Sequence, residues 1–140
     1  MHALPYASAE EADIYAWFGF VVSEVQFVEA QLLTLACLLT AQESGPEGMA
    51  ARRKSYERAT MGGLLAAIRT EMPLPESLLR ELNRLISDRN RLAHTFFHPY
   101  VGLGEPEPVP DKKYLYEVIM RAESVSRHIE RVTNGALEAL

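Results

Sequence analysis

Residues 14–39 read IYAWFGFVVSEVQFVEAQLLTLACLL, and this stretch decides the fold class of the chain. Its apolar side chains recur at alternating spacings of four and three residues, at Ile14, Phe18, Val21, Val25, Val28, Leu32, Leu35 and Leu39. This rhythm places them along one face of an α-helix. Gly45-Pro46 follows a few residues later, and we expect the long first helix to stop there.

The segment after this break is predicted to form the second helix. Residues 49–70 have a helical composition but contain Gly62-Gly63. We therefore expect either one kinked helix or two short ones, with Thr60 as a candidate N-cap.

Two more helices follow from the same rhythm of four and three. The third starts near Glu76 and is expected to end before Pro99, because a residue that precedes proline is pushed out of the α region. Its stripe consists of Leu78, Leu82, Leu85, Arg89, Leu92 and Phe96. The fourth is expected to end at Asn134-Gly135, a typical left-handed helix stop. Its stripe consists of Leu115, Val118, Ala122, Val125, Ile129 and Val132.

Four amphipathic helices joined by short connections predict an all-α fold. We expect a four-helix up-and-down bundle whose second helix is kinked or split. A chain of 140 residues has the size of one domain, so residues 1–140 are expected to form a single domain.

The composition predicts a cytoplasmic protein that does not span a membrane. Cys37 is the one cysteine, so no internal disulfide can form, and its apolar neighbours predict a buried, inert thiol. The longest uncharged run in the first helix is thirteen residues, 30–42. A bilayer span needs about twenty residues. With Glu24 and Glu29 nearby, the segment is expected to be a core helix or a subunit contact.

Charge is distributed unevenly along the chain. Residues 1–50 carry seven acidic side chains and no Lys or Arg, whereas residues 51–98 have a net charge of +4. Net acidity argues against nonspecific coating of nucleic acid but allows a local basic cleft. Arg52, Arg53 and Lys54 are candidates for contacts with RNA phosphates, and the alternative is a solvated helix face.

The stretch Arg89-Asn90-Arg91-Leu92-Ala93-His94 is the strongest functional clue. An unpaired guanidinium is costly to bury, so Arg89 on an apolar stripe must meet a carboxylate, a ligand or a partner subunit. Glu24 and Glu29 are the internal candidates. Asn90 and His94 are four residues apart and therefore share one side of the helix.

This stretch resembles the signature of the HEPN superfamily, which is an arginine, a polar residue and a downstream histidine on the third helix of a bundle. The resemblance implies a metal-independent endoribonuclease, of a toxin or defence type, whose two motifs face each other across a dimer axis. His94 would move a proton, Arg89 would hold the scissile phosphate, and Asn90 would position the phosphate or the histidine. Arg91 is a further candidate for RNA binding. The products would carry a 2′,3′-cyclic phosphate, and no cofactor or metal is expected.

Partners are also implied. Trp17, Phe20 and Phe27 lie outside the main stripe of the first helix, and such an aromatic excess predicts a homodimer interface. In HEPN toxins paired with nucleotidyltransferase antitoxins, a tyrosine often follows the histidine by two residues. Phe96 stands there in this chain and has no hydroxyl to carry a nucleotide.

Two alternatives stay open at this point. The first is a noncatalytic HEPN-like bundle that binds a protein or nucleotide partner, with Arg89 paired to Glu24 or Glu29 and His94 capping its helix. The second is a zinc site, since His94 and His98 have the spacing of two ligands on one helical face. No nearby Asp, Glu or Cys completes a ligand set, so the metal site is not the expected outcome.

Overall fold

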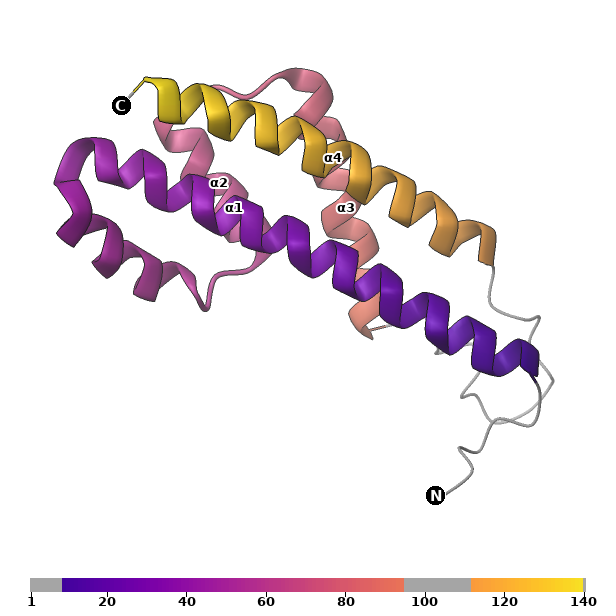
Figure 1. Ribbon diagram of the computed structural model, residues 1–140. Helices are drawn as coiled ribbons and strands as arrows, with labels where there is room; N and C mark the ends of the chain where they lie inside the picture. Colours follow the sequence, from indigo (N-terminus) through magenta and orange to yellow (C-terminus); the bar gives the residue numbers. More distant parts are fainter. Residues whose placement is uncertain (1–8, 95–111, 140) are drawn as a thin grey trace.

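The computed structural model describes residues 9–94 and 112–139. Within these residues the chain is all-helical, without a strand, and the predicted all-α class is confirmed. Its helices are α1 (Ala9–Tyr56), α2 (Met61–Glu71), α3 (Glu76–His94) and α4 (Lys112–Glu138) (Figure 1). The predictions that involve Phe96, His98 and Pro99 lie outside the described residues.

The predicted stripe of α1 forms one side of the core. Its buried members are Ile14, Val21, Val25, Val28, Leu32, Leu35 and Leu39, and Phe18 is partly buried against them. The most extensive packing of α1 is against α4, whose predicted stripe is buried from Leu115 to Ile129. Cys37 is also buried, as predicted.

α1 is broken at Gly45. The backbone there has φ 70° and ψ −170°, a region that glycine enters freely and other residues do not. Pro46 then starts a second helical segment, 46–56, because proline is well suited to the first position of a helix. Figure 1 shows this segment folding back from the end of the long helix. The predicted stop at Gly45-Pro46 is confirmed, and the next helix starts at Pro46 rather than Met49.

The second predicted helix is split, which was one of its two expected forms. Segment 46–56 ends at Tyr56, and α2 begins at Met61 with Thr60 as its N-cap. The Gly63 N–H donates to Thr60 Oγ1 over 3.0 Å, which confirms the predicted cap. Gly62 and Gly63 therefore lie in the first turn of α2, and the break comes before them.

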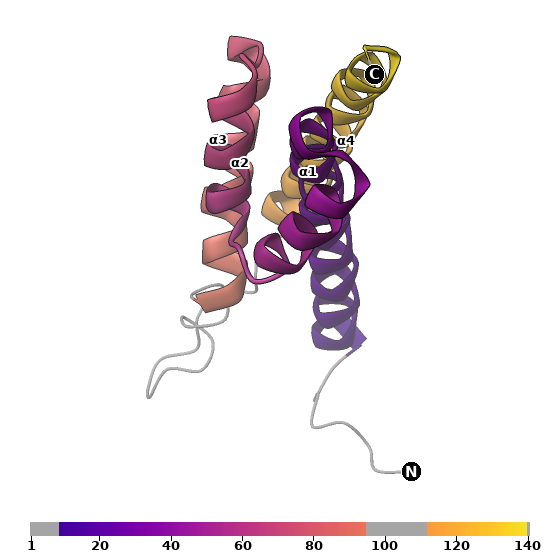
Figure 2. The same cartoon turned by 90° about the vertical axis from the view of Figure 1, so that its left-hand side faces the viewer.

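α1 and α4 run parallel to each other. Asp13 pairs with Lys112 near their starts, and farther along Gln31 Nε2 donates to the Ser126 carbonyl over 3.3 Å. In a four-helix up-and-down bundle the first and last helices would be antiparallel. That order is not confirmed, because the reversal at Gly45 adds one more change of direction (Figures 1 and 2).

The predicted end of the fourth helix is wrong. α4 continues through Asn134-Gly135 to Glu138, and the Ala139 N–H donates to the Gly135 carbonyl over 3.2 Å. Gly135 does not take the positive φ of a helix stop. The physical reason is packing, since Ala136 lies partly buried against the core and favours another helical turn.

The helices form two layers. Figure 2 shows α2 and α3 on one side and the long helices α1 and α4 on the other. α3 runs antiparallel to α1 and α4. Its C-terminal part, which carries the predicted motif, meets α1 at Glu29 and meets α4 near its start, at Tyr114 (Figure 1).

The apolar part of α1 is long enough to raise the question of a membrane span. By length and composition, Asp13–Thr40 could cross a membrane, which is weak evidence because the core helix of a soluble protein meets the same criterion. One stripe of this segment is buried inside the protein. The cytoplasmic location stays a prediction.

Candidate functional site

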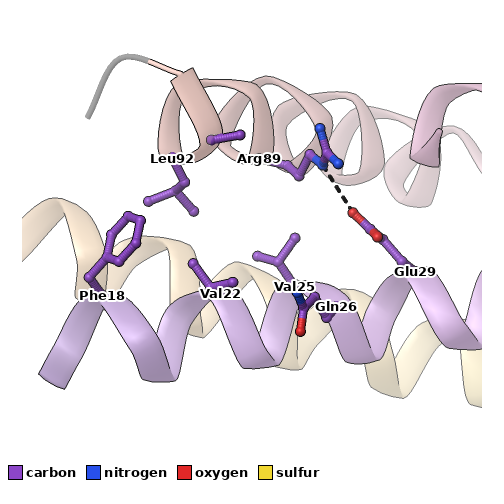
Figure 3. Close-up of a pocket in the computed structure, with 8 residues that line it drawn as sticks. Phe18, Val22, Val25, Gln26, Glu29, Arg89 and Leu92 are labelled. Carbon is purple, nitrogen blue, oxygen red and sulfur yellow. Dashed lines mark hydrogen bonds and ion pairs between the residues drawn. The ribbon is translucent and has the colours of Figure 1, made fainter. Parts of the chain in front are cut away.

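Arg89 reaches from α3 to α1. Its Nε donates to Glu29 Oε1 over 3.1 Å, and the two side chains are 38% and 29% exposed (Figure 3). Of the two predicted carboxylate partners, Glu29 is thus the one that pairs with Arg89. The expectation that Arg89 occupies a core position is wrong, because its side chain lies at the edge of the bundle with over a third of its surface exposed.

The core position belongs to the neighbouring Asp88, which is buried at 9% exposure. The Tyr114 hydroxyl donates to Asp88 Oδ1 over 2.9 Å, and Arg121 Nη1 donates to Oδ2. The Arg121 side chain is 11% exposed, and its Nε also lies 3.7 Å from Glu81 Oε2. A buried ion pair therefore joins α3 to α4 one residue before the predicted motif.

Sequence reasoning missed this pair, although a signal for it was present. Asp88 follows Leu85 by three residues and precedes Leu92 by four, so it fits the apolar rhythm as well as Arg89 does. Arg121 directly precedes Ala122 of the fourth stripe. Two opposite charges next to apolar stripes are the sequence signal of a buried pair.

Arg91 lies on the side of α3 that faces α4. Its guanidinium lies 4.0 Å from the centre of the Tyr114 ring, a cation–π distance. Burial raises the pKa of the Tyr114 hydroxyl above its usual value, and the hydrogen bond to Asp88 raises it further. Arg89 and Arg91 thus point to different neighbours, and they do not form one basic patch.

A pocket of about 280 Å³ lies between α1 and α3, and we call it the α1–α3 pocket. It is lined by Phe18, Val22, Val25, Gln26, Glu29, Arg89, Leu92 and Ala93. Most of its walls are apolar, and the Arg89–Glu29 ion pair stands at one end, with Phe18 at the other (Figure 3).

A smaller hollow of about 160 Å³ lies on the other side of Arg89, between the start of α2 and α3. Its lining comprises Thr60, Met61, Gly62, Ile86, Arg89 and Asn90. Arg89 therefore borders two hollows, and Asn90 borders the smaller one. Of the three candidate catalytic residues, Arg89 and Asn90 thus share a hollow.

His94 ends the described part of α3 and is exposed. It lines neither the α1–α3 pocket nor the smaller hollow. Asn90 is exposed one turn before it on the same side of the helix. In the part of the chain that the structure describes, His94 therefore shares neither of the two hollows that Arg89 borders.

The predicted basic run lies on segment 46–56. Arg52, Arg53 and Lys54 are exposed, and Arg53 Nε lies 4.0 Å from Glu57 Oε1, four residues along the chain. None of the three lines either hollow at Arg89. Their exposure fits a solvated helix face, the alternative reading of this run.

The described residues contain no group of three or more His, Cys, Asp or Glu side chains placed to hold a metal ion. Cys37 is buried, and that burial raises the pKa of its thiol, which makes it a poor nucleophile.

The aromatic residues expected at a dimer interface lie on another face of α1. Phe20 and Phe27 are 51% and 57% exposed, whereas Trp17 packs partly against the core. Val22 and Glu29 face α3. Phe20 precedes Val22 by two residues and Phe27 precedes Glu29 by two residues, and two residues correspond to about 200° around a helix. The exposed phenylalanines therefore point away from the Arg89 site.

Comparison with known proteins gives no relative: no family model, no curated protein and no solved structure matches this chain. The likeness to the HEPN superfamily stays a prediction based on residues 89–94.

Proposed function

We propose that the chain is a metal-independent endoribonuclease of HEPN type, with a site built from Arg89, Asn90 and His94 of two copies. The proposal is supported most by the position of Arg89, which is 38% exposed between two hollows and next to the exposed Asn90. A guanidinium in this place is accessible to a phosphate. The four-helix, HEPN-like description of the fold belongs to the same proposal.

The reaction would be an internal transesterification. The ribose 2′-oxygen attacks the adjacent phosphorus, so a P–O2′ bond forms, the P–O5′ bond breaks and a 2′,3′-cyclic phosphate results. One His94 takes the 2′-hydroxyl proton, and His94 of the second copy protonates the leaving 5′-oxygen. The terminal N–H groups of Arg89 hold the phosphate, while its Nε stays on Glu29 and fixes the guanidinium plane.

The proposal includes a second copy because, among the described residues, His94 lines neither of the two hollows beside Arg89. In this arrangement the copies meet through the motif end of α3. A dimer through Phe20 and Phe27 would leave the motifs apart, because these residues face away from α3. The toxin or defence role, and a nucleotidyltransferase antitoxin as partner, rest on the family resemblance.

A noncatalytic bundle is the second candidate, and one observation favours it. The Arg89–Glu29 pair already gives the guanidinium an opposite charge within the chain, as a structural arginine requires. In that case the exposed Phe20 and Phe27 would contact a protein partner.

The two candidates are separated by incubating single-stranded RNA with the full-length chain in EDTA. We expect the wild type to form 2′,3′-cyclic phosphate ends and His94→Ala to be at least about 100-fold slower, since general acid–base catalysis contributes that much. Asn90→Ala should also be slower. Asn83→Ala is its matched control, because Asn83 is exposed on the same face of α3 two turns earlier.

Equal inactivity of the wild type and His94→Ala would contradict the nuclease and favour the noncatalytic bundle. Sedimentation at micromolar concentration tests the second copy. Only a 15.7 kDa species there, together with full cleavage activity, would contradict the two-copy site.

A further inference from the structure

The α1–α3 pocket combines two kinds of surface. Phe18, Val22, Val25 and Leu92 make it apolar, while Glu29 brings a carboxylate to the end next to Arg89 (Figure 3). Gln26, an exposed residue one helical turn before Glu29, borders the pocket with an amide that can donate and accept. A ligand of this pocket needs apolar faces and one hydrogen-bonding edge.

A single nucleobase has this combination of properties. The volume of about 280 Å³ lies just below the range of about 300 to 1,000 Å³ typical of small-molecule sites, so the pocket admits one ring system rather than a larger ligand. Proteins recognise unstacked RNA bases by packing against their faces and hydrogen bonding to their edges. The pocket offers side chains for both contacts.

The carboxylate selects among the bases. A carboxylate is an acceptor with about four sites on its two oxygens, and Arg89 uses one site on Oε1, so both oxygens can still accept from a ligand. Guanine presents two neighbouring donors, N1–H and N2–H₂, on its Watson–Crick edge, with O6 beside them for the Gln26 amide. Adenine and cytosine would place a ring-nitrogen acceptor next to the carboxylate, and uracil has one donor between two acceptors.

We propose that the α1–α3 pocket is a subsite for a guanine base, read by Glu29 and Gln26. The assignment of this base to an RNA substrate rests on the proposed nuclease function. Glu29 contacts Arg89, the expected phosphate ligand, so the base would belong to a nucleotide next to the scissile phosphate. Cleavage would then occur beside guanines.

The test is calorimetric titration of the full-length chain with guanosine 5′-monophosphate and with the adenosine, cytidine and uridine monophosphates. We expect the guanosine nucleotide to bind at least about tenfold more tightly, the discrimination that one good pair of hydrogen bonds gives. Glu29→Gln should remove this preference, because an amide presents a donor as well as an acceptor.

Val22→Phe tests the location. Val22 is half-buried in the pocket wall, two helical turns before Glu29, so the added ring should fill pocket space and nucleotide binding should be lost. Ser23→Phe is the matched control, because Ser23 is exposed on another side of α1 and its variant should bind as the wild type does. Circular dichroism of both variants checks that they are folded.

Equal affinity for the four nucleotides, or a preference for another base, would overturn the guanine assignment. Guanosine nucleotide binding that survives Val22→Phe would overturn the location. These titrations need no cleavage, so a guanine preference without RNA cleavage would refute the nuclease alone. Cleavage without a base preference would refute the subsite alone.

Discussion

Asp88→Ala should be among the most destabilising single substitutions on α3. The change leaves the Arg121 guanidinium, 11% exposed, without its main partner. Removing one member of a buried ion pair costs about 3 to 5 kcal/mol. Glu81, which is 42% exposed and 3.7 Å from Arg121 Nε, keeps part of the attraction. We therefore expect a loss at the lower end, about 3 kcal/mol of unfolding free energy, which includes the hydrogen bond from Tyr114.

The assay is urea unfolding followed by circular dichroism, with the free energy taken from the midpoint and slope. The double variant Asp88→Ala with Arg121→Met should be more stable than Asp88→Ala alone, because no buried charge is then left unpaired. Glu57→Ala is the control, since the Arg53–Glu57 pair is exposed and should contribute no more than about 0.5 kcal/mol.

A loss below about 1 kcal/mol for Asp88→Ala would refute the reasoning, because the pair would then behave like a surface pair. The reasoning would also be refuted if the double variant lost as much unfolding free energy as Asp88→Ala and Arg121→Met lose in sum. That result would mean that Asp88 and Arg121 are not energetically coupled.

Three further predictions concern single residues. Gly45→Ala should lower the unfolding free energy by about 1 to 3 kcal/mol, because alanine is strained at the φ of 70° there. Gly19→Ala, at an open site in α1, should raise the unfolding free energy by up to about 1 kcal/mol. Equal effects of the two substitutions in urea unfolding would contradict this. Burial raises the pKa of Tyr114 above its usual 10.0 in the folded chain, so the stabilisation that neutral Tyr114 gives is fully present below pH 10.0 and is lost as the pH rises further. Tyr114→Phe should therefore flatten the fall of the unfolding free energy with alkaline pH. An unchanged slope would contradict this prediction. Cys37 should react with a thiol reagent only as fast as the chain opens, and rapid labelling of the native protein would contradict its burial.

The parts of the fold that the sequence predicted depend on local chemistry. The α1 stripe follows from the spacing of its apolar residues, the break at Gly45 from a Gly-Pro pair, and the cap at Thr60 from a hydroxyl before a helical run. Each of these signals lies within a few residues of the structure it determines.

The parts that were missed depend on distant residues. The periodicity of α3 allows either Asp88 or Arg89 to face the core, and Arg121, thirty-three residues away, decides between them. Asn134-Gly135 has the composition of a helix stop, but the packing of Ala136 on the core carries α4 onward. At the candidate site, Glu29 was one of two expected partners of Arg89, and only the relative placement of α1 and α3 selects it.

The pairing of α1 with α4 also affects how the chain is made. Gln31 and its partner Ser126 are 95 residues apart, so a ribosome that adds about 5 to 20 residues per second needs about 5 to 20 s to synthesise the intervening chain. During that interval the apolar stripe of the first helix has emerged without its principal partner. The nascent protein therefore passes through a stage that is prone to aggregation, and a chain that stops before Lys112 lacks the helix that would cover this stripe.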